Sequence, residues 1–213
     1  MGCAQPDCPK QSCSIPGDGI GTINNQDGST YTGEIVNGQM HGEGTLTFKN
    51  GSVYKGSFYN NHQYGNGQIT YADGSNYTGE FENDTIHGHG TLTFINGDEY
   101  EGEFVDDVQY GHGIMRYNNG DVYEGNFQFG DLNGVGTLKY SNGDTYEGEF
   151  ENNLKHGSGK MTYQNGTVYE GEFREDEPVQ KEILEKAEIK QIQVENETKE
   201  KDMNKIVDMM CVM

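Results

Sequence analysis

Between residues 17 and 173 the chain consists of short runs in which apolar and polar residues alternate with a period of two. In the run 100–104, the tyrosine, glycine and phenylalanine fall on one face of an extended strand and two glutamates on the other. A second kind of run, such as 88–94, places glycine, leucine and phenylalanine on one face. Asn-Gly or Asp-Gly pairs separate the runs and are a strong hairpin signal, because both residues tolerate positive φ. The pattern therefore predicts antiparallel β-hairpins.

These runs form an internal repeat. The tyrosine recurs every 23 residues, at Tyr31, Tyr54, Tyr77, Tyr100, Tyr123, Tyr146 and Tyr169. A glycine follows each tyrosine by two residues, and Ile35 or a phenylalanine follows by four. Strands are expected near 31–35 and 44–48 and every 23 residues thereafter. The predicted fold class is an all-β repeat: an elongated, single-layer antiparallel β-meander in which each unit contacts only its neighbours.

Glycine at a fixed strand position usually marks the close approach of another group. The tyrosine and phenylalanine rings of one repeat are expected to lie across the glycines of the next. A single sheet has no second layer to cover these rings, so part of the aromatic face is expected to remain open as a stripe. Aromatic anchors concentrate binding energy. The predicted partner-binding residues lie in the middle of the array: Tyr77, Tyr100, Tyr123, Tyr146, Phe81, Phe104 and Phe127.

Composition supports a thin, ring-based core. Only 31% of the 213 residues are hydrophobic, while glycine accounts for 32 residues, tyrosine for 14 and phenylalanine for nine. So many aromatic residues argue against a disordered chain. The scarcity of aliphatic residues argues against a thick, two-layer enzyme core.

The charge balance restricts the partners. The net charge is −21, and residues 17–173 hold 23 acidic and six basic residues. A nucleic-acid-binding footprint is therefore missing, and an anionic membrane surface would be repelled by the array. A basic protein segment, helical or extended, is the partner that this charge favours.

The repeat resembles a known family at these columns. The residues Tyr-x-Gly-x-Phe, His-Gly-x-Gly-Thr-Leu and Asn-Gly are similar to the MORN (membrane occupation and recognition nexus) repeat, over about residues 17–173. The resemblance implies a non-catalytic protein, as in radial-spoke heads of cilia, in junctophilins at membrane contacts and in scaffolds of apicomplexan budding. Departures are Ile35 in the aromatic column and Tyr64, Tyr110 and Asn133 in the histidine column.

Two functions remain open from the sequence. The first is a scaffold or adaptor that binds a protein segment along an aromatic groove in a ciliary, cytoskeletal or cortical assembly. The alternative is a phospholipid-binding membrane organiser, or the regulatory module of a lipid kinase. No catalytic residue, cofactor or metal site is predicted. His87 and His89 share one side of a strand and are interpreted as structural, and Cys3, Cys8 and Cys13 lack zinc spacing.

Residues 1–16 form a leader that starts Met1-Gly2-Cys3. Gly2 is a candidate for myristoylation and adjacent Cys3 for palmitoylation, which together supply two membrane-anchoring signals. Pro6 stands where the myristoylation pattern has serine or threonine, so an unmodified leader is the competing reading. Labelling with a myristate analogue distinguishes the two. The cysteines lie only near the ends of the chain, which favours a reducing compartment and a cytoplasmic location, in a cilium or cytoskeleton or at the cytoplasmic face of a membrane.

Residues 174–213 change in character: glycine disappears and charged residues dominate. Met203, Ile206, Val207 and Met210 have helical spacing and predict an amphipathic α-helical tail. Three roles remain open for this helix: capping the last repeat, docking in the protein's own groove, or dimerisation.

Overall fold

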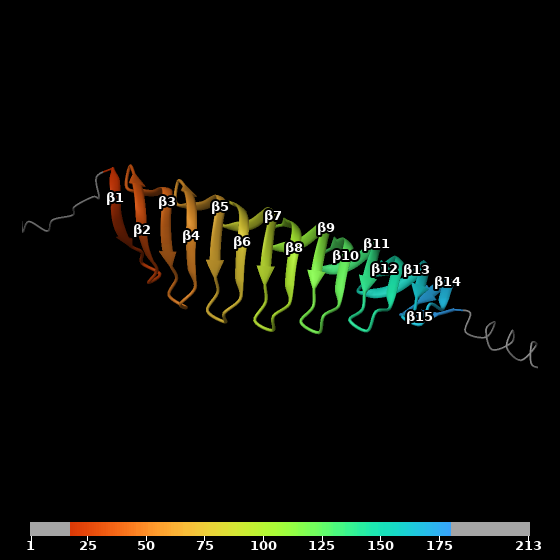
Figure 1. Cartoon of the computed structure of the whole chain (residues 1–213). Helices are drawn as coiled ribbons and strands as arrows, with labels where there is room; N and C mark the ends of the chain where they lie inside the picture. The colour runs from red at the N-terminus through yellow and green to blue at the C-terminus, as the bar shows by residue number, and fades with distance from the viewer. Residues whose placement is uncertain (1–17, 180–213) are drawn as a thin grey trace, which may run out of the picture.

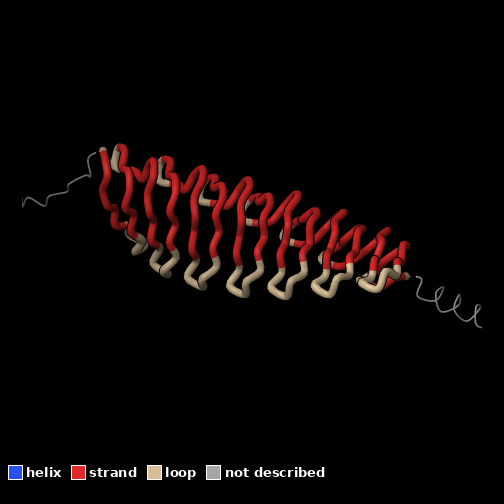
Figure 2. The backbone as a smooth tube through the Cα atoms, viewed as in Figure 1, coloured by secondary structure: helices blue, strands red, loops and turns tan. Residues whose placement is uncertain are grey.

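The computed structural model describes residues 18–179, which form one open antiparallel sheet of 15 strands in chain order (Figure 1). Because neighbouring strands in the sheet are consecutive in the chain, the predicted meander is confirmed. There is no helix within this range (Figure 2). The predicted leader and tail helix lie outside the described residues. The strands are β1 (Gly19–Asn24), β2 (Thr30–Val36), β3 (Gln39–Thr47), β4 (Val53–Tyr59), β5 (His62–Thr70), β6 (Asn76–Glu82), β7 (Thr85–Thr93), β8 (Glu99–Val105), β9 (Val108–Arg116), β10 (Val122–Gln128), β11 (Asp131–Lys139), β12 (Thr145–Glu151), β13 (Leu154–Thr162), β14 (Val168–Arg174) and β15 (Glu177–Pro178).

Two kinds of turn alternate along the sheet. The longer loops contain the Asn-Gly pairs and lie along one edge, drawn in tan in Figure 2. In the loop after β3 only the glycine, Gly51, has a positive φ (94°), while the Asn50 side chain accepts a hydrogen bond from the Ser52 amide at 2.9 Å. The expectation that both residues adopt positive φ is therefore wrong at these loops. The asparagine carboxamide completes the turn instead, and asparagine keeps an ordinary backbone.

The other edge carries two-residue turns in which both residues have positive φ. Asn83 (49°) and Asp84 (70°) connect β6 to β7, and Asp106 (48°) and Asp107 (68°) connect β8 to β9. These values are typical of the type I′ turn, which matches the right-handed twist of the flanking strands. Asparagine and aspartate tolerate this conformation better than other non-glycine residues.

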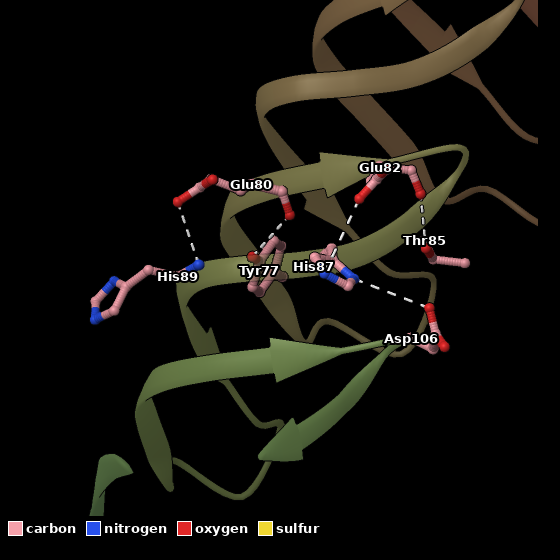
Figure 3. Close-up of polar contacts among 7 residues, drawn as sticks. All are labelled: Tyr77, Glu80, Glu82, Thr85, His87, His89 and Asp106. Carbon is pink, nitrogen blue, oxygen red and sulfur yellow. Dashed lines mark hydrogen bonds and ion pairs between the residues drawn. The ribbon is translucent and has the colours of Figure 1, made fainter. Parts of the chain in front are cut away.

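Each hairpin bends, so that the sheet covers part of its own face. A register shift between Gly79 and Phe81 interrupts the pairing of β6 with β7. In β7, Gly88 has a φ of 65°, which a residue with a side chain rarely adopts. Figure 3 shows β7 turning near His89, between the hairpin tip and the remainder of the strand. The bend brings the Glu80 carbonyl to 3.0 Å from the Tyr77 hydroxyl, which donates a hydrogen bond to it.

The core tyrosines pack over glycines of their own repeat. Gly102 on β8 pairs with Gly113 on β9, and a Cβ built at Gly113 would lie 2.5–2.7 Å from the Tyr100 ring. The expectation that a ring covers the glycines of the next repeat is therefore wrong for the tyrosines. Tyr100 and Phe104 instead connect repeats through their edges: Tyr100 lies 5.0 Å from Phe104 and 4.8 Å from Phe127 of the following repeat. Such edge-to-face contacts form a continuous ladder of rings along the array.

Hydrogen bonds also connect each two-residue turn to the preceding repeat. The Asn61 amide donates to the Met40 carbonyl at 3.0 Å, and the Met40 amide donates to Asn61 Oδ1 at 2.9 Å. Asp84, Asp107, Asn153 and Asp176 accept equivalent side-chain bonds from the amides of Gln63, Ile86, Leu132 and Lys155. This reciprocal pair fixes the spacing of successive hairpin tips.

Replacing Asn61 by glycine tests this connection. Asn61→Gly keeps the positive φ but removes the acceptor for the Met40 amide, so the free energy of unfolding is expected to fall by about 1 kcal/mol. Urea denaturation measures the change. Asn61→Asp is the matched control, because aspartate fills this column at Asp84 and Asp107 with the same bond. Equal losses in the two variants would contradict a role for the side-chain acceptor.

Candidate functional site

The structure places the predicted partner-binding residues in the core. The side chains of Tyr77, Tyr100, Tyr123 and Tyr146 are 0% exposed, and those of Phe81, Phe104 and Phe127 are 1–4% exposed. The bent hairpins cover these rings. A single sheet was expected to leave them partly open, but the bend provides the missing cover. A partner therefore has no access to the four tyrosines. Among the seven residues, Phe81 contributes to the wall of an open hollow.

A second aromatic column provides the open stripe instead. These rings lie where the second strand of each repeat runs into its long loop, and five of them are half-buried against the core. Tyr163 at the end of the column is 36% exposed. The column is Phe48, Tyr71, Phe94, Tyr117, Tyr140 and Tyr163. Its 23-residue period is visible in the sequence, but only the bend shows that this column faces solvent while the other is covered.

Three members of this column line a groove of about 800 Å³ that extends from β3 to the turn after β8. These three rings are Phe48, Tyr71 and Phe94. Further apolar surface in the groove comes from Leu46 on β3 and from Ile69, Phe81, Ile86 and Leu92 on β5 to β7. Clefts that are largely apolar with a few placed polar groups are the usual form of a ligand site.

Three carboxylates line the groove, together with the uncharged polar residues Gln63 and Ser75. Asp84 and Asp107 reach it from the two-residue turns, and Asp73 reaches it from the loop after Tyr71. Burial raises the pKa of the Tyr71 hydroxyl, and the nearby charges of Asp107 and Asp73 raise it further. Tyr71 therefore stays protonated at neutral pH, in a negative field. The groove is suited to an apolar ligand with a positive charge.

The decisive comparison is with protein families. The model of the MORN repeat matches six consecutive segments that cover more than half of the chain: residues 31–53, 54–76, 77–99, 100–122, 123–145 and 146–168. The chain is a MORN-repeat protein. Each matched segment begins at a core tyrosine and contains one bent hairpin, so the family unit and the structural unit coincide.

The solved structures to which the chain is similar have low sequence identity and low TM-scores. The TCP domain of SAS-4 (dCPAP) from Drosophila melanogaster, in complex with a proline-rich motif of Ana2, is 15% identical with a TM-score of 0.43, covering 80% of this chain and 99% of that one. The TCP10 domain of Danio rerio CPAP, in complex with a STIL peptide, is 18% identical with a TM-score of 0.25, covering 72% and 84%. Virginiamycin B lyase from Staphylococcus aureus is 13% identical with a TM-score of 0.18, covering 73% and 56%. No curated protein sequence matches the chain.

The end of the MORN array shows how a cation occupies the aromatic side. Lys155 on β13 donates a hydrogen bond from Nζ to the Tyr140 hydroxyl at 3.1 Å, and Nζ lies 5.5 Å from the centre of the Tyr140 ring. Asp176 of the following turn lies 3.9 Å from Nζ. The Lys155 side chain is 14% exposed. Aromatic ring, hydroxyl and carboxylate together hold this ammonium group.

The histidines on β7 are separated by the bend. His87 faces Glu82 and Asp106 at 4.0 and 3.9 Å, whereas the backbone amide of His89 donates to Glu80 at 3.2 Å. Figure 3 shows the His89 ring directed away from His87. Across residues 18–179, no three histidine, cysteine, aspartate or glutamate side chains are grouped to hold a metal ion.

Proposed function

We propose that this MORN array is a non-catalytic scaffold that binds an extended protein segment along its groove. The observation that carries the proposal is the column of half-buried rings beside apolar surface, bordered by Asp73, Asp84 and Asp107. Rings of this kind supply contact area at low entropic cost. The carboxylates favour a segment that bears lysine or arginine.

The spacing of the repeats favours an extended ligand over a helix. One repeat adds two strands about 4.8 Å apart, so equivalent rings recur about every 9.6 Å. A polyproline II segment advances about 9.3 Å in each three-residue turn and stays in step with the rings. An α-helix returns to the same face after seven residues, or about 10.5 Å, and loses register about three times faster. The proposed ligand places every third side chain against one repeat.

Peptide selection followed by groove substitutions tests the proposal. Random peptides displayed on phage are selected on the full chain, and the enriched peptides are titrated by calorimetry. The double variant Tyr71→Ala, Phe94→Ala is expected to weaken their binding at least tenfold, in the range of interface hot spots. Tyr64→Ala is the matched control, because this ring is 48% exposed and lies outside the groove. Failure to enrich any peptide, or equal binding by all three proteins, overturns the proposal.

Membrane attachment through acyl groups on Gly2 and Cys3 stays a prediction, because both residues lie outside the described range. No helix among residues 18–179 has the length and apolarity needed to cross a membrane. In this proposal the array contacts protein, and any lipid contact belongs to the leader.

A further inference from the structure

We propose that Tyr71, Ile86 and Asp107 form a binding site for one lysine or arginine side chain of the partner segment. This inference rests on the proposed function and specifies the chemistry of the ligand at one place in the groove. The three residues come from successive repeats and line the same hollow.

The chain itself contains the occupied form of this site. Tyr140, Lys155 and Asp176 stand 69 residues, or three repeats, after Tyr71, Ile86 and Asp107. There the lysine ammonium lies between a tyrosine hydroxyl at 3.1 Å and an aspartate carboxylate at 3.9 Å. In the earlier position Ile86 replaces the lysine, so the tyrosine and the aspartate are present without the cation. Ile86 is 4% exposed and extends the apolar surface, where the methylene groups of an incoming lysine or arginine would pack.

No other repeat offers the same pair within the described array. The corresponding positions are Phe48 with Asp84, Phe94 with Gly130, and Tyr117 with Asn153, so each lacks the hydroxyl, the carboxylate or both. Asp84 is already engaged, since it lies 2.5 Å from His62. Asp107 forms no ion pair among residues 18–179, although its Oδ1 accepts the Ile86 amide at 2.7 Å. Tyr71 and Asp107 are therefore the place in the groove where a hydroxyl and an unpaired carboxylate can receive one cation.

A partner segment is the occupant that these features favour. The groove carries negative charge at three carboxylates, and the wider array holds 23 acidic and six basic residues. A basic side chain gains a charge-assisted hydrogen bond and a ring contact at the same place. The Lys155 arrangement shows that the fold accommodates this combination without further change.

The test uses a peptide selected on the full chain and its lysine→glutamine counterpart. With the wild-type protein, the exchange is expected to raise the Kd about tenfold, as for one partly buried charged hydrogen bond. With Asp107→Asn the ratio is expected to fall close to one. This variant keeps a side-chain oxygen that accepts the Ile86 amide, as Asn61 and Asn153 accept the equivalent amides, and it removes only the charge. Asp106→Asn is the charge-matched control, since Asp106 faces His87 and does not line the groove.

A third variant fills the site from within the chain. Ile86→Lys reproduces the Lys155 arrangement, so it is expected to abolish the preference for lysine over glutamine. An unchanged preference in Asp107→Asn and in Ile86→Lys, with peptide binding intact, would overturn this inference and leave the proposed function standing. Absence of any selected peptide would instead refute the proposed function. Selected peptides that match Met203–Met210 would assign the groove to the chain's own tail and overturn the inference of a basic partner segment.

Discussion

Above pH 10 the array is expected to unfold steeply with rising pH. Burial raises the pKa of the core tyrosines, to about 12 for Tyr146, and neighbouring carboxylates such as Glu149 add to the shift. The pKa values of Tyr31, Tyr54, Tyr77, Tyr100 and Tyr123 are raised as well, in each case chiefly by burial. All six side chains are 0% exposed.

The direction follows from where the protons are released. In the unfolded chain the phenols ionise near pH 10, whereas in the folded array they stay neutral to higher pH. The stability that depends on neutral rings is therefore fully present below pH 10, and it is lost as the pH rises through the folded-state pKa values. Between the unfolded and the folded pKa values, each tyrosine contributes up to about 1.4 kcal/mol per pH unit, so the six together contribute at most roughly 8 kcal/mol for each pH unit. This exceeds half the stability of a typical domain.

Urea denaturation at pH 8, 10 and 11, followed by circular dichroism, measures the loss. Tyr100→Phe is the matched variant, because it keeps the ring and removes one titrating group. It is expected to reduce the pH dependence by about one sixth and to cost about 1 kcal/mol at neutral pH, since the hydrogen bond from Tyr100 to the Glu103 carbonyl (2.9 Å) is lost. The full tyrosinate absorbance of all 14 tyrosines, developing near pH 10 while the β signal persists, would show that the core rings are open to solvent.

The alternation and the 23-residue period were enough to predict the strands, their antiparallel order and the rings of the core. Each strand has its apolar residues in step with one face, and a slip of one residue would expose Tyr100 and Phe104 together. The bend was not predictable in the same way. Gly88 belongs to an ordinary alternating run, and its positive φ depends on pairing with the neighbouring strand.

The bend explains why the candidate site differs from the prediction. It covers the column of core rings, such as Tyr100 and Phe104, and leaves the second aromatic column, including Tyr71 and Phe94, at the surface. Two-residue turns such as Asn60-Asn61 and Asp106-Asp107 contain no glycine, so they lack the Asn-Gly or Asp-Gly signal that marks the longer loops. The proposed cation site combines side chains that are up to 36 residues apart, at Tyr71 and Asp107. Their proximity requires the register of four successive strands, which local patterns do not contain.

The paired glycines provide the sharpest test of the ring-on-glycine packing. Gly125 on β10 lies opposite Gly136, and a Cβ built on it would lie 2.5 Å from the Gly136 Cα and 2.5 Å from the Tyr123 hydroxyl. The local preference of a strand favours valine over glycine by about 1 kcal/mol. The steric conflict opposes this preference, because it involves a backbone atom of the paired strand and not only the end of a flexible side chain.

Gly125→Val is therefore expected to lower the free energy of unfolding by about 3–5 kcal/mol, the range for overpacking combined with the loss of a buried aromatic ring. The melting temperature should fall by about 10 °C for a chain of this size. Glu124→Val is the matched control, because Glu124 precedes Gly125 on the same strand, is exposed, and faces the opposite side of the sheet. It introduces the same residue without meeting the Tyr123 ring. Strand preference alone predicts a gain in stability for both variants. Equal melting temperatures for Gly125→Val and Glu124→Val would therefore show that the glycine column is not a ring-packing surface.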